Sequence, residues 1–380
     1  MKKRYRKKLV VLCGGTGGHF YPGLAVARYY VKYGGSAKLL ISGRHSQKQS
    51  ETAGKFGIET RILPAMPTPV GLKGKLKFST LFFNNVLKQK KILKEENPDF
   101  VLGMGSFNTV PSGIATKLLK IPLFLHDGNS YFGKANIMLS RFARHAGVAF
   151  PPVNGSRLRC PYTVTGMPLR SEIYPEYWKK ITGDNSVSTL NQRLGTEFSS
   201  DIPLILIFGG SQGAKTFNIE LPRLLKKAEN LGFQVLHLSG PGRKSEAEEA
   251  YSGASFRYHI AESSDEIGLL YTAASLVVSR VGGSTVAELA LYGKTAFLIP
   301  FPYASEDHQT MNAEYYTSRG ASEIIQENEL ENLFPDLFRK YLTSLEQMFE
   351  KSKETLSLAK PDAAEDLIEI MEKNCETGKC

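Results

Sequence analysis

The feature that most constrains this chain is a series of short apolar runs, most of them leading into a glycine loop or a turn, with helical spacing after them. The runs lie at residues 9–13, 38–41, 100–102, 123–125 and 148–150, then at 204–208, 234–238, 276–279 and 296–299. Residues 162–166 are expected to form a last strand of the first series. Strands that are apolar on both faces and alternate with helices are typical of parallel sheets covered on both sides. Each half begins its own series, so the pattern predicts two doubly wound parallel-sheet domains of the α/β class, each Rossmann-like.

The domain organisation follows from where these series begin and end. We expect an N-terminal domain over residues 1–165 and a C-terminal domain over residues 166–354. Near the end of the chain, apolar residues from Leu356 to Met371 recur at helical spacing. This spacing predicts a packed terminal helix over about residues 355–375.

Charge is divided unevenly between the two halves. Residues 1–170 hold 28 Lys and Arg against 6 Asp and Glu, a net charge of +22, and residues 171–380 have a net charge of −11, which together give the +11 of the whole chain. A half this basic is expected to bind a polyanion, either nucleic acid or an anionic membrane surface. No recognised nucleic-acid motif accompanies the charge, so nucleic acid is the weaker interpretation. No apolar run reaches 18 residues, so no membrane span is predicted.

Glycine-rich loops follow the first strand of each half. The loop at residues 14–19 departs from the dinucleotide pattern GxGxxG, because Phe20 stands at the third glycine. The loop at residues 209–216 departs from the phosphate-binding pattern GxxxxGK[ST], because Ala214 replaces its second glycine. An oxidoreductase and an NTPase are therefore both poor interpretations.

A third segment, residues 279–288, suggests a nucleoside-diphosphate site. A strand breaks at Gly282-Gly283 and a helix begins near Ser284, so the N–H groups at the helix start can bind a diphosphate. Glu288 lies one turn further on, where a carboxylate can bind ribose hydroxyls. The alternative is that Glu288 only stabilises the start of its own helix.

Together these blocks resemble the MurG family of bacterial glycosyltransferases. The similar blocks, in the family's order and spacing, are residues 14–19, 22–25, 209–214, 300–302, 307–310 and 312–313. The resemblance covers nearly the whole chain and implies the GT-B fold, with two facing Rossmann-like domains. It also implies an inverting hexosyltransferase that moves GlcNAc from UDP-GlcNAc to the C4 hydroxyl of MurNAc in lipid I. The implied product is lipid II for peptidoglycan, and the implied location is the cytoplasmic face of the bacterial cell membrane, with the chain as a peripheral protein.

The resemblance assigns roles in the N-terminal domain by matching position. His19 is the candidate catalytic base or acceptor-positioning residue, since an imidazole titrates near neutrality. The alternative is that His19 caps or packs at the start of its helix. Thr16, Gly17 and Gly18 would line the acceptor side, Asn129 would contact GlcNAc hydroxyls, and Arg170 would face the diphosphate.

The resemblance also assigns roles in the C-terminal domain. The implied contacts are Ser211, Gly283, Ser284 and Thr285 to the diphosphate, Glu288 to the ribose, Gln309 to the sugar and the Ser264 backbone to the uracil. No Asp-x-Asp triplet occurs, so a metal held by paired aspartates is not expected. The resemblance adds no cofactor. The helix dipole and Arg170 would stabilise the leaving group instead.

Departures from the family pattern leave rival functions open. They lie mainly around the expected acceptor pocket, at Ser106, Val110, Asp127, Gly128 and Met167, with Ser263-Ser264 replacing an apolar pair near the uracil. One rival is a diacylglycerol glycosyltransferase of the same fold. The other is a non-catalytic protein that binds a nucleotide sugar.

A basic segment with bulky apolar residues is a candidate membrane contact. On a helix, Leu76, Phe83 and Val86 fall along one stripe, with Lys73, Lys75 and Lys77 nearby. Such a helix is typical of membrane-surface elements, and each Lys or Arg near anionic lipid contributes about 1 kcal/mol. The alternative is a core helix with a solvated basic face.

Overall fold

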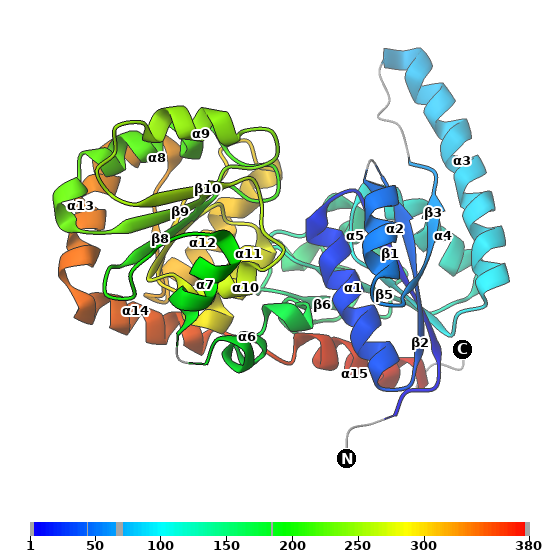
Figure 1. Ribbon diagram of the computed structural model, residues 1–380. Coiled ribbons are helices and arrows are strands. Elements are labelled where there is room, and N and C mark those ends of the chain that lie inside the picture. Colours follow the sequence, from blue (N-terminus) through cyan, green and yellow to red (C-terminus); the bar gives the residue numbers. More distant parts are fainter. Residues whose placement is uncertain (1–3, 44, 66–70, 184, 377–380) are drawn as a thin grey trace. The chain divides into compact units, whose positions relative to one another are not determined.

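The chain forms two compact units. The computed structural model describes residues 4–43, 45–65, 71–183 and 185–376. One unit comprises residues 1–170 and 362–380, and the other comprises residues 171–361 (Figure 1). Both divisions fall slightly later in the chain than the sequence-based boundaries at residues 165 and about 355.

The described part of the first unit contains a parallel sheet with strand order β3-β2-β1-β4-β5-β6-β7. Its strands are β1 (Lys8–Gly14), β2 (Ser36–Ser42), β3 (Glu59–Leu63), β4 (Phe100–Gly103), β5 (Leu123–Asp127), β6 (His145–Val148) and β7 (Tyr162–Val164). Its helices are α1 (Gly17–Lys32), α2 (Ser46–Gly54), α3 (Gly71–Glu96), η1 (Phe107–Thr109), α4 (Val110–Leu119), α5 (Lys134–Leu139), η2 (Gly155–Arg157) and α15 (Ala363–Glu376). Leu9 to Leu12 of β1 are all buried, because helices cover both faces of the sheet.

The second unit repeats this plan with strand order β10-β9-β8-β11-β12-β13 in its described part. Its strands are β8 (Leu204–Phe208), β9 (Gln234–Leu238), β10 (Tyr258–Ala261), β11 (Leu276–Ser279), β12 (Ala296–Leu298) and β13 (Glu323–Ile324). The helices around this sheet are α8 (Lys215–Lys226), η4 (Glu229–Leu231), α9 (Lys244–Tyr251), α10 (Ile267–Ala273), α11 (Gly283–Tyr292), η5 (Ser305–Asp307), α12 (His308–Thr317), η6 (Glu327–Glu329), α13 (Leu330–Thr343) and α14 (Leu345–Ser357). Three further helices, η3 (Ser171–Ile173), α6 (Pro175–Thr182) and α7 (Ser186–Leu194), precede β8.

The prediction of two α/β parallel-sheet domains is confirmed, but its strand list needs correction. β3, β10 and β13 were not predicted, and all three lie at sheet edges, where a strand has a neighbour on one side only and is less apolar. The strand expected at residues 148–150 lies at His145–Val148.

The predicted terminal helix is two helices. α14 ends at Ser357 and α15 begins at Ala363. Pro361 lies between them, and a proline disfavours helical backbone geometry at the residue before it, so the helix is interrupted there. Leu367, Ile368 and Met371 of α15 join the core that includes β1 and α1. Gly147 of β6 makes this packing possible, because a Cβ there would lie 2.5 Å from Leu367 Cδ1.

Candidate functional site

Each unit places its glycine-rich loop at the carboxyl edge of its sheet, where the strand order reverses. The order reverses between β1 and β4 in the first unit and between β8 and β11 in the second. The loops at residues 14–19 and 209–214 follow β1 and β8, and residues 280–282 follow β11. Ligands of doubly wound sheets bind at these reversals.

The first loop is shaped by close contact with the loop after β4. A Cβ at Gly14 would lie 2.5 Å from the Cβ of Ser106, and Gly15 has a φ of +62° that favours glycine. Ser106 itself has a φ of +72°, a left-handed conformation that favours glycine. Thr16 stands before α1, and its side chain makes no capping hydrogen bond to the first turn of the helix.

His19 is half-buried and its ring has a defined tautomer. Its Nδ1 lies 3.2 Å from the carbonyl oxygen of Gly14 and 3.1 Å from Thr16 Oγ1. Because a carbonyl oxygen only accepts, the bond to Gly14 assigns the proton to Nδ1 and the lone pair to Nε2. Gly105 lies against the Nε2 edge, where a Cβ would come within 3.2 Å of the ring. The ring therefore has the geometry of a proton acceptor.

His126 is the second histidine at this edge, and it is structural. It is fully buried at the end of β5, and its Nε2 lies 3.0 Å from the carbonyl oxygen of Gly166. Burial lowers its pKa below the usual value, so the ring is neutral at pH 7.

Asn129 lies on the turn after β5, at the same carboxyl edge as His19. Its backbone N–H donates to Asp127 Oδ1 at 3.2 Å. Gly128, between them, makes room for Met167, because a Cβ at Gly128 would lie 2.5 Å from Met167 Cε. Two departures from the family pattern, Gly128 and Met167, are therefore complementary in shape.

Arg170 ends the first unit beside the start of α1. Its guanidinium carbon lies 4.4 Å from the ring centroid of Tyr21, a cation–π contact that fixes the side chain. Tyr21 is two residues after His19 on α1, so Arg170 lies on the same side of the unit as the glycine loop.

The loop after β8 is held by contacts that only glycine allows. Gly213 has a φ of +69°, and a Cβ there would lie 2.1 Å from the carbonyl oxygen of Ser239. Ser211 is exposed at the loop tip, and Ala214 precedes α8 without a capping side chain. The first N–H groups of α8 can therefore bind an anion.

A second helix start lies beside this loop, after β11. Gly282 precedes α11, no side chain caps the helix and no acidic residue lies in its first turn. Gly283 is buried, and Ser284 and Thr285 are half-buried. This helix start can bind an anion for the same reason as that of α8.

Glu288 lies beyond the first turn of α11, so stabilising the start of this helix does not explain a glutamate at this position. Its Oε2 accepts a hydrogen bond from the hydroxyl of Tyr271 at 2.9 Å. Burial, and after it the charge of Glu288, raises the pKa of Tyr271 well above its usual value, so this phenol remains a donor. The bond orients the carboxylate.

Gln309 of α12 is oriented by the backbone. Its Oε1 accepts from Val281 N–H at 3.1 Å and from Phe301 N–H at 3.0 Å. Asn312 holds the same segment by donating to the Val281 carbonyl oxygen at 3.1 Å. A sugar hydroxyl at Gln309 would therefore meet the Nε2 donor rather than the oxygen.

Ser264 lies in the loop between β10 and α10. It is half-buried, and its Oγ accepts from Glu266 N–H at 3.1 Å. This short turn leaves the backbone of residues 262–265 at the carboxyl edge of the second sheet, beside the end of β10.

Arg280 is a residue to which the sequence reasoning gave no role. It is 7% exposed, donates to the carbonyl oxygen of Pro300 at 2.8 Å and forms an ion pair with Glu327. Glu327 in turn accepts from Thr216 Oγ1 at 2.7 Å. Arg280 thus ties β11, β12 and the start of α8 together at the site edge. The sequence signal that could have indicated this role is a single arginine directly after the apolar run at residues 276–279.

The predicted membrane stripe is partly corrected by the burial of α3. Phe83 is 63% exposed, but Val86 is 5% exposed, so the assignment of Val86 to the outward stripe is wrong. The side chains of Leu76, Lys73, Lys75 and Lys77 lie outside the described residues. Phe78 and Phe82 contact Phe107 of η1 with ring centroids 6.0 and 6.4 Å away, which extends the aromatic surface toward the first loop. No helix among the described residues has the length and apolar composition to cross a bilayer.

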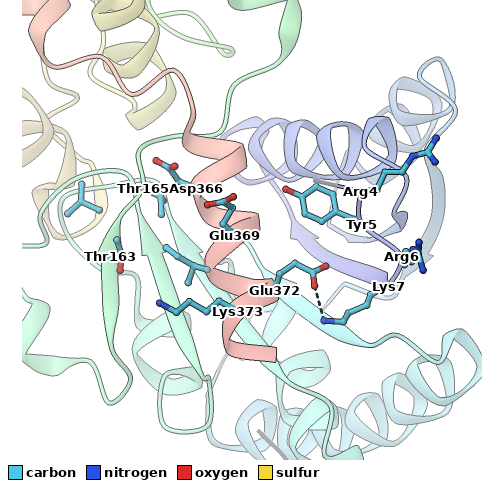
Figure 2. Close-up of a pocket in the computed structure, with 12 residues that line it drawn as sticks. Arg4, Tyr5, Arg6, Lys7, Thr163, Thr165, Asp366, Glu369, Glu372 and Lys373 are labelled. Atoms are coloured by element: carbon cyan, nitrogen blue, oxygen red, sulfur yellow. Dashed lines mark hydrogen bonds and ion pairs between the residues drawn. The ribbon is translucent and has the colours of Figure 1, made fainter. Parts of the chain in front are cut away.

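A cavity of about 800 Å³ lies elsewhere in the first unit, between residues 4–7, β7 and α15 (Figure 2). None of the predicted site residues lines it. Its lining mixes cations with carboxylates, and Lys7 Nζ pairs with Glu372 at 2.8 Å within it. Because side chains of both charge signs line the cavity, it shows no preference for an anionic ligand such as a diphosphate.

Two parallel α/β units, each with a glycine loop and an uncapped helix start at its switch point, define the class of nucleotide-sugar enzymes with the GT-B fold. Residues 9–148 match the glycosyltransferase family 28 N-terminal domain and residues 204–367 match its C-terminal domain. The chain belongs to the family of UDP-N-acetylglucosamine–N-acetylmuramyl-(pentapeptide) pyrophosphoryl-undecaprenol N-acetylglucosamine transferases, the MurG family.

Individual relatives match over most of their length. The transferase of Psychromonas ingrahamii is 32% identical, and the match covers 97% of this chain and 98% of that protein. The transferase of Dichelobacter nodosus is 36% identical, and the match covers 85% of this chain and 86% of that protein. The crystal structure of Acinetobacter baumannii MurG has a TM-score of 0.74 at 24% identity and covers 97% of this chain and 99% of its own. A UDP-GlcNAc 2-epimerase from Neisseria meningitidis bound to UDP-GlcNAc has a TM-score of 0.68 at 15% identity, covering 96% of this chain and 100% of its own. The fold therefore hosts more than one reaction.

Proposed function

We propose that this protein transfers GlcNAc from UDP-GlcNAc to the C4 hydroxyl of MurNAc in lipid I, with inversion at the sugar carbon. The observation that carries the mechanism is the His19 ring, whose Nδ1 bond to Gly14 leaves the lone pair on Nε2. Family membership and the two uncapped helix starts support the donor and acceptor classes.

The reaction is a single displacement. His19 Nε2 accepts the proton of the C4 hydroxyl, and the hydroxyl oxygen forms a bond to C1 of GlcNAc. The bond from C1 to the diphosphate oxygen breaks, and its electron pair leaves with UDP. The N–H groups at the start of α11 and the Arg170 guanidinium stabilise the charge that develops on the diphosphate. Glu288 binds the ribose, Ser211 the diphosphate, the Ser264 backbone the uracil, and Asn129 and Gln309 the sugar.

The test is transfer of labelled GlcNAc to a short-chain lipid I analogue, with a diacylglycerol acceptor in parallel. We expect product on the lipid I analogue alone. Product on diacylglycerol alone would make the protein a glycolipid synthase. UDP-GlcNAc binding without product on either acceptor would make it a non-catalytic binding protein.

Replacing Gln309 by glutamate isolates its donor role. A glutamate can keep both backbone N–H bonds to Oε1 but lacks the Nε2 donor. We expect kcat/KM for UDP-GlcNAc to fall roughly tenfold to hundredfold, while the affinity for UDP stays within a few-fold. Gln347→Glu on exposed α14 adds the same charge and is the control. Equal losses of UDP and UDP-GlcNAc affinity would contradict a sugar contact.

We also propose that the protein works as a peripheral protein on the cytoplasmic face of the cell membrane, docked through α3. Phe83→Ser is expected to weaken binding to phosphatidylglycerol vesicles by tenfold or more, since burying a phenylalanine contributes about 1.5–3 kcal/mol. Phe349 on α14, 60% exposed, provides the matched control Phe349→Ser. Vesicle co-sedimentation measures both variants, and equal losses would argue against docking through α3.

A further inference from the structure

Asp127 is a buried carboxylate at the predicted acceptor side that accepts hydrogen bonds from the turn after it and from α5. It is 6% exposed. Its Oδ1 accepts from Asn129 N–H at 3.2 Å, and its Oδ2 accepts from Gly133 N–H at 3.0 Å and Asn136 Nδ2 at 2.9 Å. A carboxylate has about four acceptor positions, so the turn occupies two of them and Asn136 of α5 a third.

The same turn is held from its other side by Asn154. Its Oδ1 accepts from Phe132 N–H at 2.8 Å, and its Nδ2 donates to the Phe132 carbonyl oxygen at 3.3 Å. Val153 N–H adds a bond to the Ser130 carbonyl oxygen at 2.8 Å. Residues 128–133 therefore have two side-chain anchors, Asp127 and Asn154.

Asn136 extends the anchor toward His19. Its Nδ2 donates both to Asp127 and to the carbonyl oxygen of His126, the latter at 3.0 Å. A Cβ at Gly105 would lie 3.5 Å from Asn136 Nδ2 and 3.2 Å from His19 Nε2, so both side chains pack on Gly105. Asp127 is thus linked to the Asn129 turn directly and to the His19 ring through packing.

We infer that Asp127 is a positioning residue that fixes the 128–133 turn so that Asn129 meets the sugar, and that it does not take the acceptor's proton. This inference rests on the proposed transferase function. It assigns proton transfer to His19 and gives the Asp127 carboxylate the role of an anchor for the turn.

A double-mutant cycle between Asp127→Asn and Asn129→Ala tests the inference. A misplaced contact of about 1 Å costs up to about hundredfold, so Asp127→Asn should lower kcat/KM for UDP-GlcNAc roughly tenfold to hundredfold. In the Asn129→Ala background the same change should cost less than about threefold, because the two residues act as one unit. The acidic limb of the kcat–pH profile of Asp127→Asn should lie at the same pH as that of the wild type.

Two outcomes would overturn the inference. The first is that the losses in kcat/KM of the two single variants multiply in the double variant. The second is that Asp127→Asn loses 10³-fold or more and shifts the acidic limb of the pH profile, as expected for a general base. Asp99→Asn is the control, since Asp99 Oδ2 also accepts a backbone N–H, from Lys8 at 2.6 Å, at the other end of β1. If Asp127→Asn does not fold, Asn154→Ala, which removes the second anchor of the turn, replaces it in the double-mutant cycle with Asn129→Ala. The wild-type transfer rate tests the proposed function separately.

Discussion

Replacing His19 by alanine is expected to lower kcat for GlcNAc transfer by about 10²- to 10⁴-fold, the usual contribution of a general base. The reason is the tautomer, since Nδ1 bonds to the Gly14 carbonyl oxygen and Nε2 carries the lone pair. Donor affinity, measured by calorimetry with UDP-GlcNAc, should stay within a few-fold. This split between catalysis and binding separates a base from a packing residue.

Two further variants make the His19 result interpretable. His19→Gln can retain a bond to the Gly14 carbonyl oxygen but cannot accept a proton at neutral pH, so it should be as inactive as His19→Ala. His145→Gln is the control, because His145 bonds to Thr163 Oγ1 at 2.9 Å at the amino end of β6. A decrease of less than about threefold in His19→Gln would assign His19 to packing at the helix start.

Replacing Gly213 by alanine should destabilise the second unit by about 3 kcal/mol or more. Its φ of +69° costs a non-glycine residue about 1–2 kcal/mol, and its Cβ would lie 2.1 Å from the Ser239 carbonyl oxygen. A backbone atom cannot move aside as a flexible side chain does. The loop after β8 must therefore shift, and thermal unfolding should begin at a clearly lower temperature.

Gly210 provides the matched control for Gly213. It has a φ of +81° in the same loop, but a Cβ there meets nothing within 4 Å. Gly210→Ala should therefore cost only the conformational energy of about 1–2 kcal/mol. Equal unfolding temperatures for the two variants would show that the contact with Ser239 has no effect on stability.

Several features were predictable because local sequence fixes them. Apolar strands such as Leu204–Phe208 are buried on both faces, and this requires a parallel sheet between two helical layers. The glycine loops after β1 and β8 and the helix start at Gly283 follow from the same local pattern. The family resemblance added the residue roles, which composition and spacing do not contain.

Other features depend on residues that are distant in the chain. The edge strands β3, β10 and β13 are held by pairing with one neighbour, so their own sequence is only weakly strand-like. Val86 was predicted on the same helical stripe as Phe83, but packing buries Val86 while Phe83 stays exposed.

The sequence by itself determined the two-domain α/β plan and the position of each glycine loop, because strand burial and backbone freedom are local properties. Only the tertiary structure decided the orientation of the reactive groups. The Gln309 orientation depends on Val281 and the Asp127 anchor on Asn136, and the His19 ring packs on Gly105. Hydrogen bonds between segments select one orientation of each side chain, and the residue type alone leaves that orientation open.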